Sequence, residues 1–212
     1  MIGGSVKLFI QGPAGKLQAL WRSGGLPQEF TKAAVICHPH PQYGGTMENK
    51  VVARCARFIA ESGIEAVRFN FRGVGQSEGS FDGGPGERDD LRAVIEHVMG
   101  ISRQTRLAVV GFSFGSWIAL EVGERHPSVT AIVGIAPPMR MFDFEYFNTS
   151  SKPKLIVYAE NDQYTPASAT KAWIESARQP IESVLIPGVD HFFGPDVDHV
   201  AVKVAQFVSI VL

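Results

Sequence analysis

The chain has 212 residues, a length typical of one domain with its own hydrophobic core. Hydrophobic residues make up 45% of it and charged residues 19%, a composition that excludes an intrinsically disordered chain. The formal net charge is −1 and the sequence holds no cluster of lysines and arginines, so we expect neither a nucleic acid nor a membrane as partner. We predict a single domain over residues 1–212.

Two cysteines, Cys37 and Cys55, lie in apolar stretches, which favours buried thiols in a reducing cytosol over a disulfide framework. The first residues lack the basic and apolar regions of a signal peptide. No apolar run approaches the ~18 residues that a membrane span needs. We therefore expect a cytoplasmic protein.

Apolar runs that predict strands alternate along the chain with amphipathic patterns that predict helices. A hairpin comes first, with strands at Val6–Ile10 and Leu17–Trp21 around the turn residues Gly12-Pro13-Ala14-Gly15. Further strands are predicted over Ala33–Cys37, Ile64–Phe69, Leu107–Val110, Val129–Ala136, Leu155–Ala159 and Ile181–Ile186. Helices are predicted over Glu48–Glu61, Glu87–Met99, Phe114–Glu124, Ala167–Ala177 and Val197–Val211. This order indicates an α/β fold, a mostly parallel twisted sheet with helices on both faces, whose reactive residues follow the carboxyl ends of the strands.

A G-x-S-x-G sequence, Gly111-Phe112-Ser113-Phe114-Gly115, stands between a predicted strand and a predicted helix. Its glycines permit a turn too tight for side chains at their positions, so that the Ser113 hydroxyl projects above the sheet. The free N–H groups at the start of the following helix favour negative charge that develops there. The alternative is a Gly/Ser turn that only caps the helix, but its place in the chain favours Ser113 as a nucleophile.

A serine hydroxyl needs an adjacent base to act as a nucleophile at neutral pH. In the architecture that carries such an elbow, the chain order is serine, acid and then histidine. His191 follows the last predicted strand and is the predicted base. The other candidates, His97, His126 and His199, fall within predicted helices or at their ends.

Asp162 follows a predicted strand between the serine and the histidine and is the predicted acid. A carboxylate there would fix the tautomer of His191 and stabilise its cation. Glu160 and Asp143 are alternative acids: Glu160 lies nearer the end of its strand, and Asp143 follows the preceding strand. We expect Asp190, although adjacent to the histidine, to point away from it.

Backbone N–H groups must bind the oxyanion that forms when serine attacks a carbonyl. One is predicted at Phe114, directly after the nucleophile. The other is expected from the loop that begins at His38, in which the two prolines have no N–H to donate. Tyr43 is the preferred donor there and Gln42 the alternative.

Three further patterns suggest cofactors but fit them poorly. His38-x-His40 has no accompanying pair of zinc ligands, so we predict no metal and a structural role for His38. Gly73-Val74-Gly75-Gln76-Ser77-Glu78 has a glutamate where a dinucleotide-binding loop needs its last glycine. Gly12-Pro13-Ala14-Gly15-Lys16 lacks the spacing of a P-loop. We therefore predict no cofactor.

Together these residues resemble the α/β-hydrolase superfamily over nearly the whole chain. The resemblance is greatest to small, lidless, bacterial carboxylesterase-like hydrolases with the build of dienelactone hydrolases. The motifs that carry it are the elbow, His38–Met47, Phe69–Gly79, Phe81–Glu87 and His191-Phe192-Phe193. It implies an α/β-hydrolase fold in which Ser113, Asp162 and His191 form a catalytic triad and Tyr43 and Phe114 form the oxyanion hole.

Two positions depart from these families. Asn70 stands where many members of the superfamily carry a structural aspartate, and Ser113 stands where dienelactone hydrolases carry a cysteine nucleophile. Neither departure removes a member of the expected triad.

Only residues Pro137–Lys152 separate two predicted strands at the point where larger relatives insert a cap domain. We therefore expect no cap domain and a pocket that is open or closed by a second copy of the chain in a homodimer. The segment is rich in large apolar side chains, which would form a substrate-binding wall or, alternatively, cover the core or a dimer contact. These side chains include Met139, Met141, Phe142, Phe144, Tyr146 and Phe147.

The sequence thus predicts a serine hydrolase that cleaves small, neutral or weakly polar carboxylic esters through an acyl-enzyme. The same residues would serve a thioesterase, a lactonase or a short-peptide hydrolase. A non-enzymatic binding protein with this fold is the third alternative, although such binding proteins often lack one member of the triad.

Overall fold

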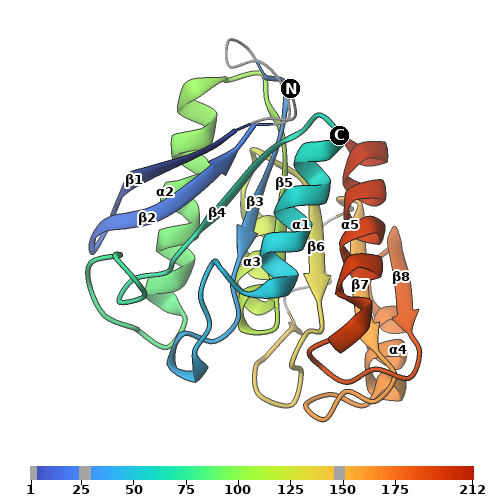
Figure 1. The fold of residues 1–212 in the computed structure, drawn as a ribbon. Coiled ribbons are helices and arrows are strands. Elements are labelled where there is room, and N and C mark those ends of the chain that lie inside the picture. Colours follow the sequence, from blue (N-terminus) through green and yellow to red (C-terminus); the bar gives the residue numbers. More distant parts are fainter. Residues whose placement is uncertain (1–3, 24–29, 146–150) are drawn as a thin grey trace.

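A computed structural model describes residues 4–23, 30–145 and 151–212. Within them the strands form one eight-stranded sheet in the order β1-β2-β4-β3-β5-β6-β7-β8 (Figure 1). Strand β2 runs antiparallel to both of its neighbours, and β4, β3, β5, β6, β7 and β8 run parallel to one another. The strands are β1 (Ser5–Gly12), β2 (Gly15–Arg22), β3 (Lys32–Cys37), β4 (Glu65–Phe69), β5 (Arg106–Phe112), β6 (Val129–Ile135), β7 (Lys154–Ala159) and β8 (Ile181–Ile186).

Helices cover both faces of this sheet, as the sequence pattern predicts. Helices α1 and α5 pack on the face shown in front in Figure 1, and α2, α3 and α4 pack on the other face. The helices are α1 (Lys50–Glu61), α2 (Pro85–Ile101), α3 (Phe114–Arg125), α4 (Ala167–Ser176) and α5 (Val197–Val211). The predicted mostly parallel α/β architecture is confirmed.

The central strands are buried on both faces, which explains their continuous apolar runs. All six residues of β7 and six of the seven in β5 are buried. Two hydrophobic cores result, one on each side of the sheet. Cys37 and Cys55 are buried free thiols, and burial raises the pKa of both, that of Cys55 to about 12. Their predicted place in the core is confirmed.

Element ends differ from the sequence prediction where single residues decide them. Helix α1 begins two residues later than expected, because the Asn49 side chain accepts a hydrogen bond from the Val51 N–H at 2.9 Å and caps the helix. Strand β6 ends one residue early, since Ala136 has a φ of 46° and leaves the extended conformation.

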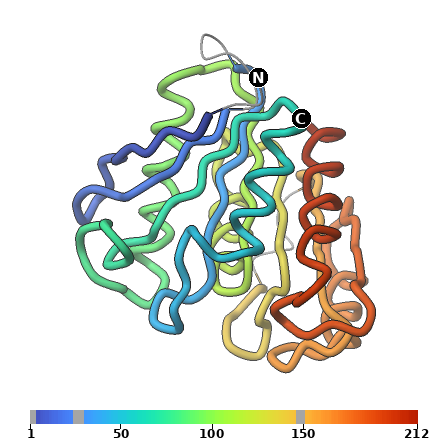
Figure 2. Tube along the Cα trace, viewed as in Figure 1, coloured from blue at the N-terminus to red at the C-terminus, as the bar shows by residue number. Residues whose placement is uncertain are grey.

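The carboxyl ends of the parallel strands meet at one edge of the sheet. The loops after β3, β6 and β8, which are far apart in the sequence, gather at the lower end of the view in Figure 2. Only residues 136–153 join β6 to β7, too few for a cap domain, so this edge has none. In the described residues, no helix is long and apolar enough to cross a bilayer.

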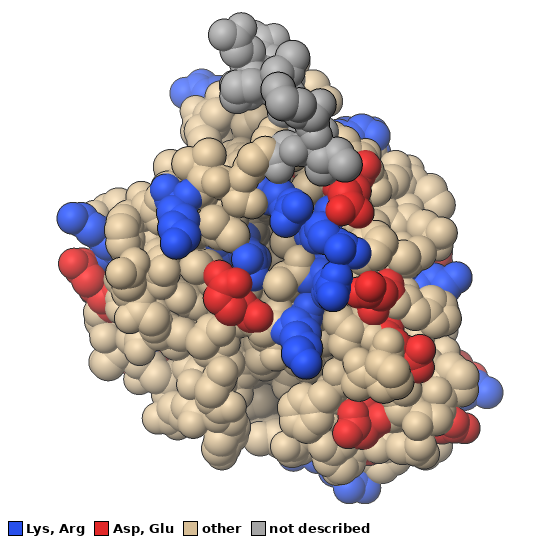
Figure 3. Space-filling view, viewed as in Figure 1, with Lys and Arg blue, Asp and Glu red and all other residues tan. Residues whose placement is uncertain are grey.

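Basic side chains gather down the middle of the face on which α1 lies, with acidic side chains beside them (Figure 3). Ion pairs of α1 and nearby residues include Arg54 with Asp198 at 3.2 Å, Arg57 with Glu61 at 3.6 Å and Arg68 with Glu48 at 3.0 Å. The basic charge on this face is therefore partly neutralised within the molecule.

Candidate active site

The turn between β5 and α3 holds Ser113 in a strained conformation. Its φ of 55° and ψ of −121° are unusual for a residue with a side chain. A Cβ atom added to Gly111 would lie 2.0 Å from the Gly115 carbonyl oxygen, and one added to Gly115 would lie 2.5 Å from the His38 carbonyl oxygen. Both flanking positions therefore require glycine, as expected for an elbow that presents the serine hydroxyl.

Ser113, His191 and Asp162 lie within hydrogen-bond distance of one another in that order. The distance from Ser113 Oγ to His191 Nε2 is 2.9 Å, and that from His191 Nδ1 to Asp162 Oδ2 is 2.7 Å. A carboxylate can only accept, so Nδ1 carries the imidazole hydrogen and Nε2 accepts from the serine hydroxyl. The structure thus brings together three side chains from the loops after β5, β7 and β8.

The carboxylate of Asp162 is held by its own loop. Its second oxygen, Oδ1, accepts hydrogen bonds from the backbone N–H groups of Tyr164 at 2.8 Å and Thr165 at 3.1 Å. The Gln163 side chain accepts from the backbone N–H of His191 at 3.3 Å. These contacts orient the carboxylate and tie the acid loop to the histidine loop.

The other acidic candidates make different contacts. Glu160 accepts from the Gly188 N–H at 2.8 Å, and the Asp143 side chain accepts from the Glu145 N–H at 2.8 Å. Asp190 accepts from the Phe192 N–H at 3.0 Å, so its carboxylate is directed to its own loop as expected. Among the predicted acids, Asp162 is the one that contacts His191.

His38 holds the loop after β3 in place. Its Nδ1 lies 2.6 Å from the Pro39 carbonyl oxygen, and its Nε2 accepts from the Phe71 N–H at 3.1 Å. Burial lowers the pKa of this imidazole to about 4, so it stays neutral at physiological pH. In the described residues, no group of three or more His, Cys, Asp and Glu side chains is arranged to hold a metal ion.

The oxyanion donor predicted at Tyr43 does not agree with the hydrogen bonds of this loop. Residues 41–43 form a short 3-10 helix in which the Tyr43 N–H donates to the His40 carbonyl at 3.1 Å. The Gln42 N–H donates to His40 Nδ1 at 3.2 Å, so the alternative donor is engaged too. The backbone N–H groups of Phe114 and His40 have no acceptor among the described residues.

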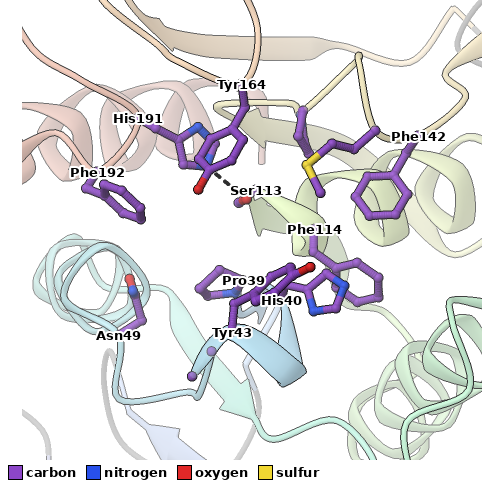
Figure 4. A pocket seen from close by; sticks show the side chains of 14 residues that line it. Pro39, His40, Tyr43, Asn49, Ser113, Phe114, Phe142, Tyr164, His191 and Phe192 are labelled. Carbon is purple, nitrogen blue, oxygen red and sulfur yellow. Dashed lines mark hydrogen bonds between the residues drawn. The ribbon is translucent and has the colours of Figure 1, made fainter.

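A pocket of about 310 Å³ opens beside Ser113 (Figure 4). Phe142 lines it, as predicted, together with Met141 from the same segment. Phe144 does not: it is 5% exposed and packs in the core against Trp173, with ring centroids 5.7 Å apart. Met139 and Phe142 both pack partly buried against this core, but of the two only Phe142 lines the pocket, so the core-cover alternative applies to Met139 and Phe144. Tyr146 lies outside the described residues.

The pocket also contains residues that the sequence reasoning missed: His40, Asn49, Tyr164 and Phe192. Tyr164 lies two residues after Asp162, and Phe192 directly follows His191. This closeness to Asp162 and His191 in the sequence is the signal that could identify them, because a loop that brings a reactive side chain to a site also brings nearby residues of the same loop.

Comparison with known proteins shows the family to which the chain belongs. The family described as serine aminopeptidase, S33, matches residues 31–144, more than half of the chain. The chain belongs to this family of α/β hydrolases.

Solved structures similar to this hydrolase include an α/β serine hydrolase homologue from Coxiella burnetii. It is 36% identical, with a TM-score of 0.86 over 95% of this chain and 96% of that one. A lidless α/β serine hydrolase from Xanthomonas campestris is 35% identical, with a TM-score of 0.86 over 96% and 93% of the two chains. An uncharacterized protein of Rickettsia prowazekii is 32% identical over 197 residues, 88% of this chain and 82% of the relative.

Proposed function

We propose that this α/β hydrolase cleaves small carboxylic esters through an acyl-enzyme, with Ser113 as nucleophile, His191 as base and Asp162 as the acid that orients it. The observation that carries the proposal is the pair of contacts at 2.9 and 2.7 Å that joins these side chains. A hydroxyl, an imidazole and a carboxylate in that order can raise the nucleophilicity of serine.

The reaction proceeds in two balanced halves. Ser113 Oγ bonds to the carbonyl carbon while its proton passes to His191 Nε2, and the bond from that carbon to the alcohol oxygen then breaks as His191 returns the proton to the alcohol. Water next attacks the acyl carbon, gives its proton to His191, and the acid leaves as Ser113 regains the proton. His191 must be neutral to accept a proton in each half.

The oxyanion formed in each half needs two backbone donors. We assign them to the N–H groups of Phe114, at the first position of α3, and His40, in place of Tyr43. Both residues line the pocket beside Ser113, and neither N–H has an acceptor among the described residues. The positive end of the α3 dipole adds to the stabilisation.

The composition of the pocket favours an ester over a peptide substrate. An aminopeptidase must bind the positively charged amino group of its substrate, which calls for a carboxylate in the pocket. Among the described residues that line this pocket, none is acidic, and most are apolar or aromatic. A neutral ester suits these surroundings better, and a thioester or lactone would react through the same groups.

The first test is hydrolysis of a short-chain aryl ester by the Ser113→Ala variant. We expect a loss of about 10³-fold or more in kcat, because the nucleophile is gone while the oxyanion donors remain. Ser209→Ala is the matched control, since Ser209 lies in α5 and hydrogen-bonds only within that helix. Equal activity of Ser113→Ala and the control would contradict the assignment.

A further inference from the structure

Ser113 lies between two unlike sides of its pocket (Figure 4). On one side stand His40, Phe114 and Phe142, which we call the aromatic wall. On the other side stand Tyr164 and Phe192, which we call the open side. Because both sides border the same reactive oxygen, they would contact different parts of one substrate.

The aromatic wall is a supported surface. The Phe114 ring is 1% exposed and lies 5.0 Å from the His40 ring and 5.6 Å from the Phe142 ring. The Phe142 ring is stacked on that of Trp117, with 4.3 Å between the ring centroids. The Arg88 guanidinium lies 4.1 Å from the centroid of the Trp117 ring. Aromatic rings packed in this way resist displacement, so the wall limits the size of a group placed against it.

The open side flanks the imidazole and faces solvent. The rings of Tyr164 and Phe192 lie 4.6 and 5.4 Å from that of His191. Their residues are 38% and 52% exposed. A substituent placed beside these two rings would therefore border solvent.

The chemistry decides which part of an ester lies on which side. His191 Nε2 gives its proton to the departing alcohol oxygen, so the alcohol leaves from beside the imidazole, which the rings of Tyr164 and Phe192 flank. The acyl carbon stays bonded to Ser113 with its oxygen at the backbone donors. The rest of the acyl group then points away from His191, toward the aromatic wall.

We infer that the substrates are esters of a compact apolar or aromatic acid with a bulky alcohol, and that Phe142 sets the size limit of the acyl group. This inference rests on the proposed ester hydrolysis. The cavity of about 310 Å³ is at the lower end of the range for ligand pockets, which suits an acyl group and not a whole large ester. The alcohol, unconfined, can belong to a much larger molecule.

Two ester series test the inference on the intact protein. In one, acyl length rises from acetate to octanoate and includes benzoate, with a fixed aryl alcohol; in the other, butyrate is fixed and the alcohol grows from methyl to a soluble polysaccharide. We expect kcat/KM to fall by about tenfold or more between butyrate and octanoate, because one extra methylene group in a tight apolar pocket can change kcat/KM by about tenfold. Alcohol size should change it far less.

Two variants locate the effect. Phe142→Ala should raise the octanoate-to-butyrate ratio of kcat/KM by about tenfold, with Phe142→Leu intermediate. The matched control, Phe192→Ala, should leave that ratio unchanged and instead raise KM for aromatic alcohols. The rate of deacylation should change in the Phe142→Ala variant and stay the same in the Phe192→Ala variant, because the alcohol has already left the acyl-enzyme at this step.

An acyl optimum that moves with Phe192→Ala, or a stronger dependence on alcohol than on acyl size, would overturn the inference while leaving ester hydrolysis intact. If the wild-type protein hydrolyses no ester in either series and Ser113 takes up no fluorophosphonate, the proposed function fails, and this inference with it.

Discussion

The elbow between β5 and α3 and the segment from Pro137 to Glu145 lie at the same edge of the sheet, yet they are built in different ways. The elbow depends on backbone geometry: a positive φ at Ser113 and close approaches at two glycines. The segment depends on where each side chain points, so that Phe142 faces the pocket while Phe144, two residues on, is in the core. A short sequence motif can therefore predict a reactive group that backbone geometry holds in place. It cannot predict which side chains of a segment line the substrate pocket.

The largest expected effect concerns Asp162, whose carboxylate is held by backbone N–H groups of its own loop. Asp162→Asn should lower kcat by about 10⁴-fold, because an amide in place of the carboxylate favours the wrong tautomer of His191 and no longer stabilises its cation. The fold should persist, since the amide oxygen can still accept from the Tyr164 and Thr165 N–H groups. Steady-state kinetics on an aryl ester give the value, with Asp143→Asn as the control. A comparable loss in Asp143→Asn and none in Asp162→Asn would move the acid to the other loop.

The next effect separates the two roles within the wall segment. Phe144→Ala should lower the free energy of unfolding by about 3–5 kcal/mol, as expected for a buried phenylalanine. Phe142→Ala should cost much less stability, because Phe142 is only partly buried, and should change substrate preference instead. Urea denaturation of both variants gives the two values. Similar losses of stability would mean that both side chains serve the core.

The smallest effect concerns His38, in the loop that carries the proposed oxyanion donor His40. His38 has a pKa of about 4 in the folded protein, below the 6.5 expected when unfolded, so the unfolded chain binds more protons between these values. Above about pH 6.5 the titration of His38 does not lower the free energy of unfolding. As the pH falls from there toward 4, this titration lowers the free energy of unfolding by about 3 kcal/mol in all.

His38→Gln should remove this part of the pH dependence, since glutamine does not titrate and can both donate and accept. The measurement is the free energy of unfolding of both proteins at a series of pH values between 4 and 7. Parallel curves for the two proteins would show that His38 is not the group that titrates.

Much of the fold follows from sequence pattern alone. The continuous apolar runs predict the parallel strands, and the helix periodicity predicts α5 to the residue, Val197–Val211. The ends of α1 and β6 were missed because they depend on one cap and one strained residue, Asn49 and Ala136. Periodicity carries no information about such single contacts.

In the candidate site, the order of reactive groups in the chain predicted which side chains meet. The prediction of Tyr43 as oxyanion donor disagrees with the structure, because proline content excludes donors but does not show which of the remaining N–H groups already have an acceptor. The Gln42 N–H donates to His40 Nδ1 and the Tyr43 N–H to the His40 carbonyl oxygen, contacts that are visible only in three dimensions. Tyr164 and Phe192 were missed because tertiary packing of two loops sets their orientation.

Covalent trapping of the nucleophile is the most direct test of this enzyme assignment. The folded protein is incubated with a fluorophosphonate, digested, and the modified peptide located by mass spectrometry. A single adduct on Ser113, absent in Ser113→Ala and much slower to form in Asp162→Asn, is the expected result. An adduct on another residue, or none on folded wild-type protein, would contradict it.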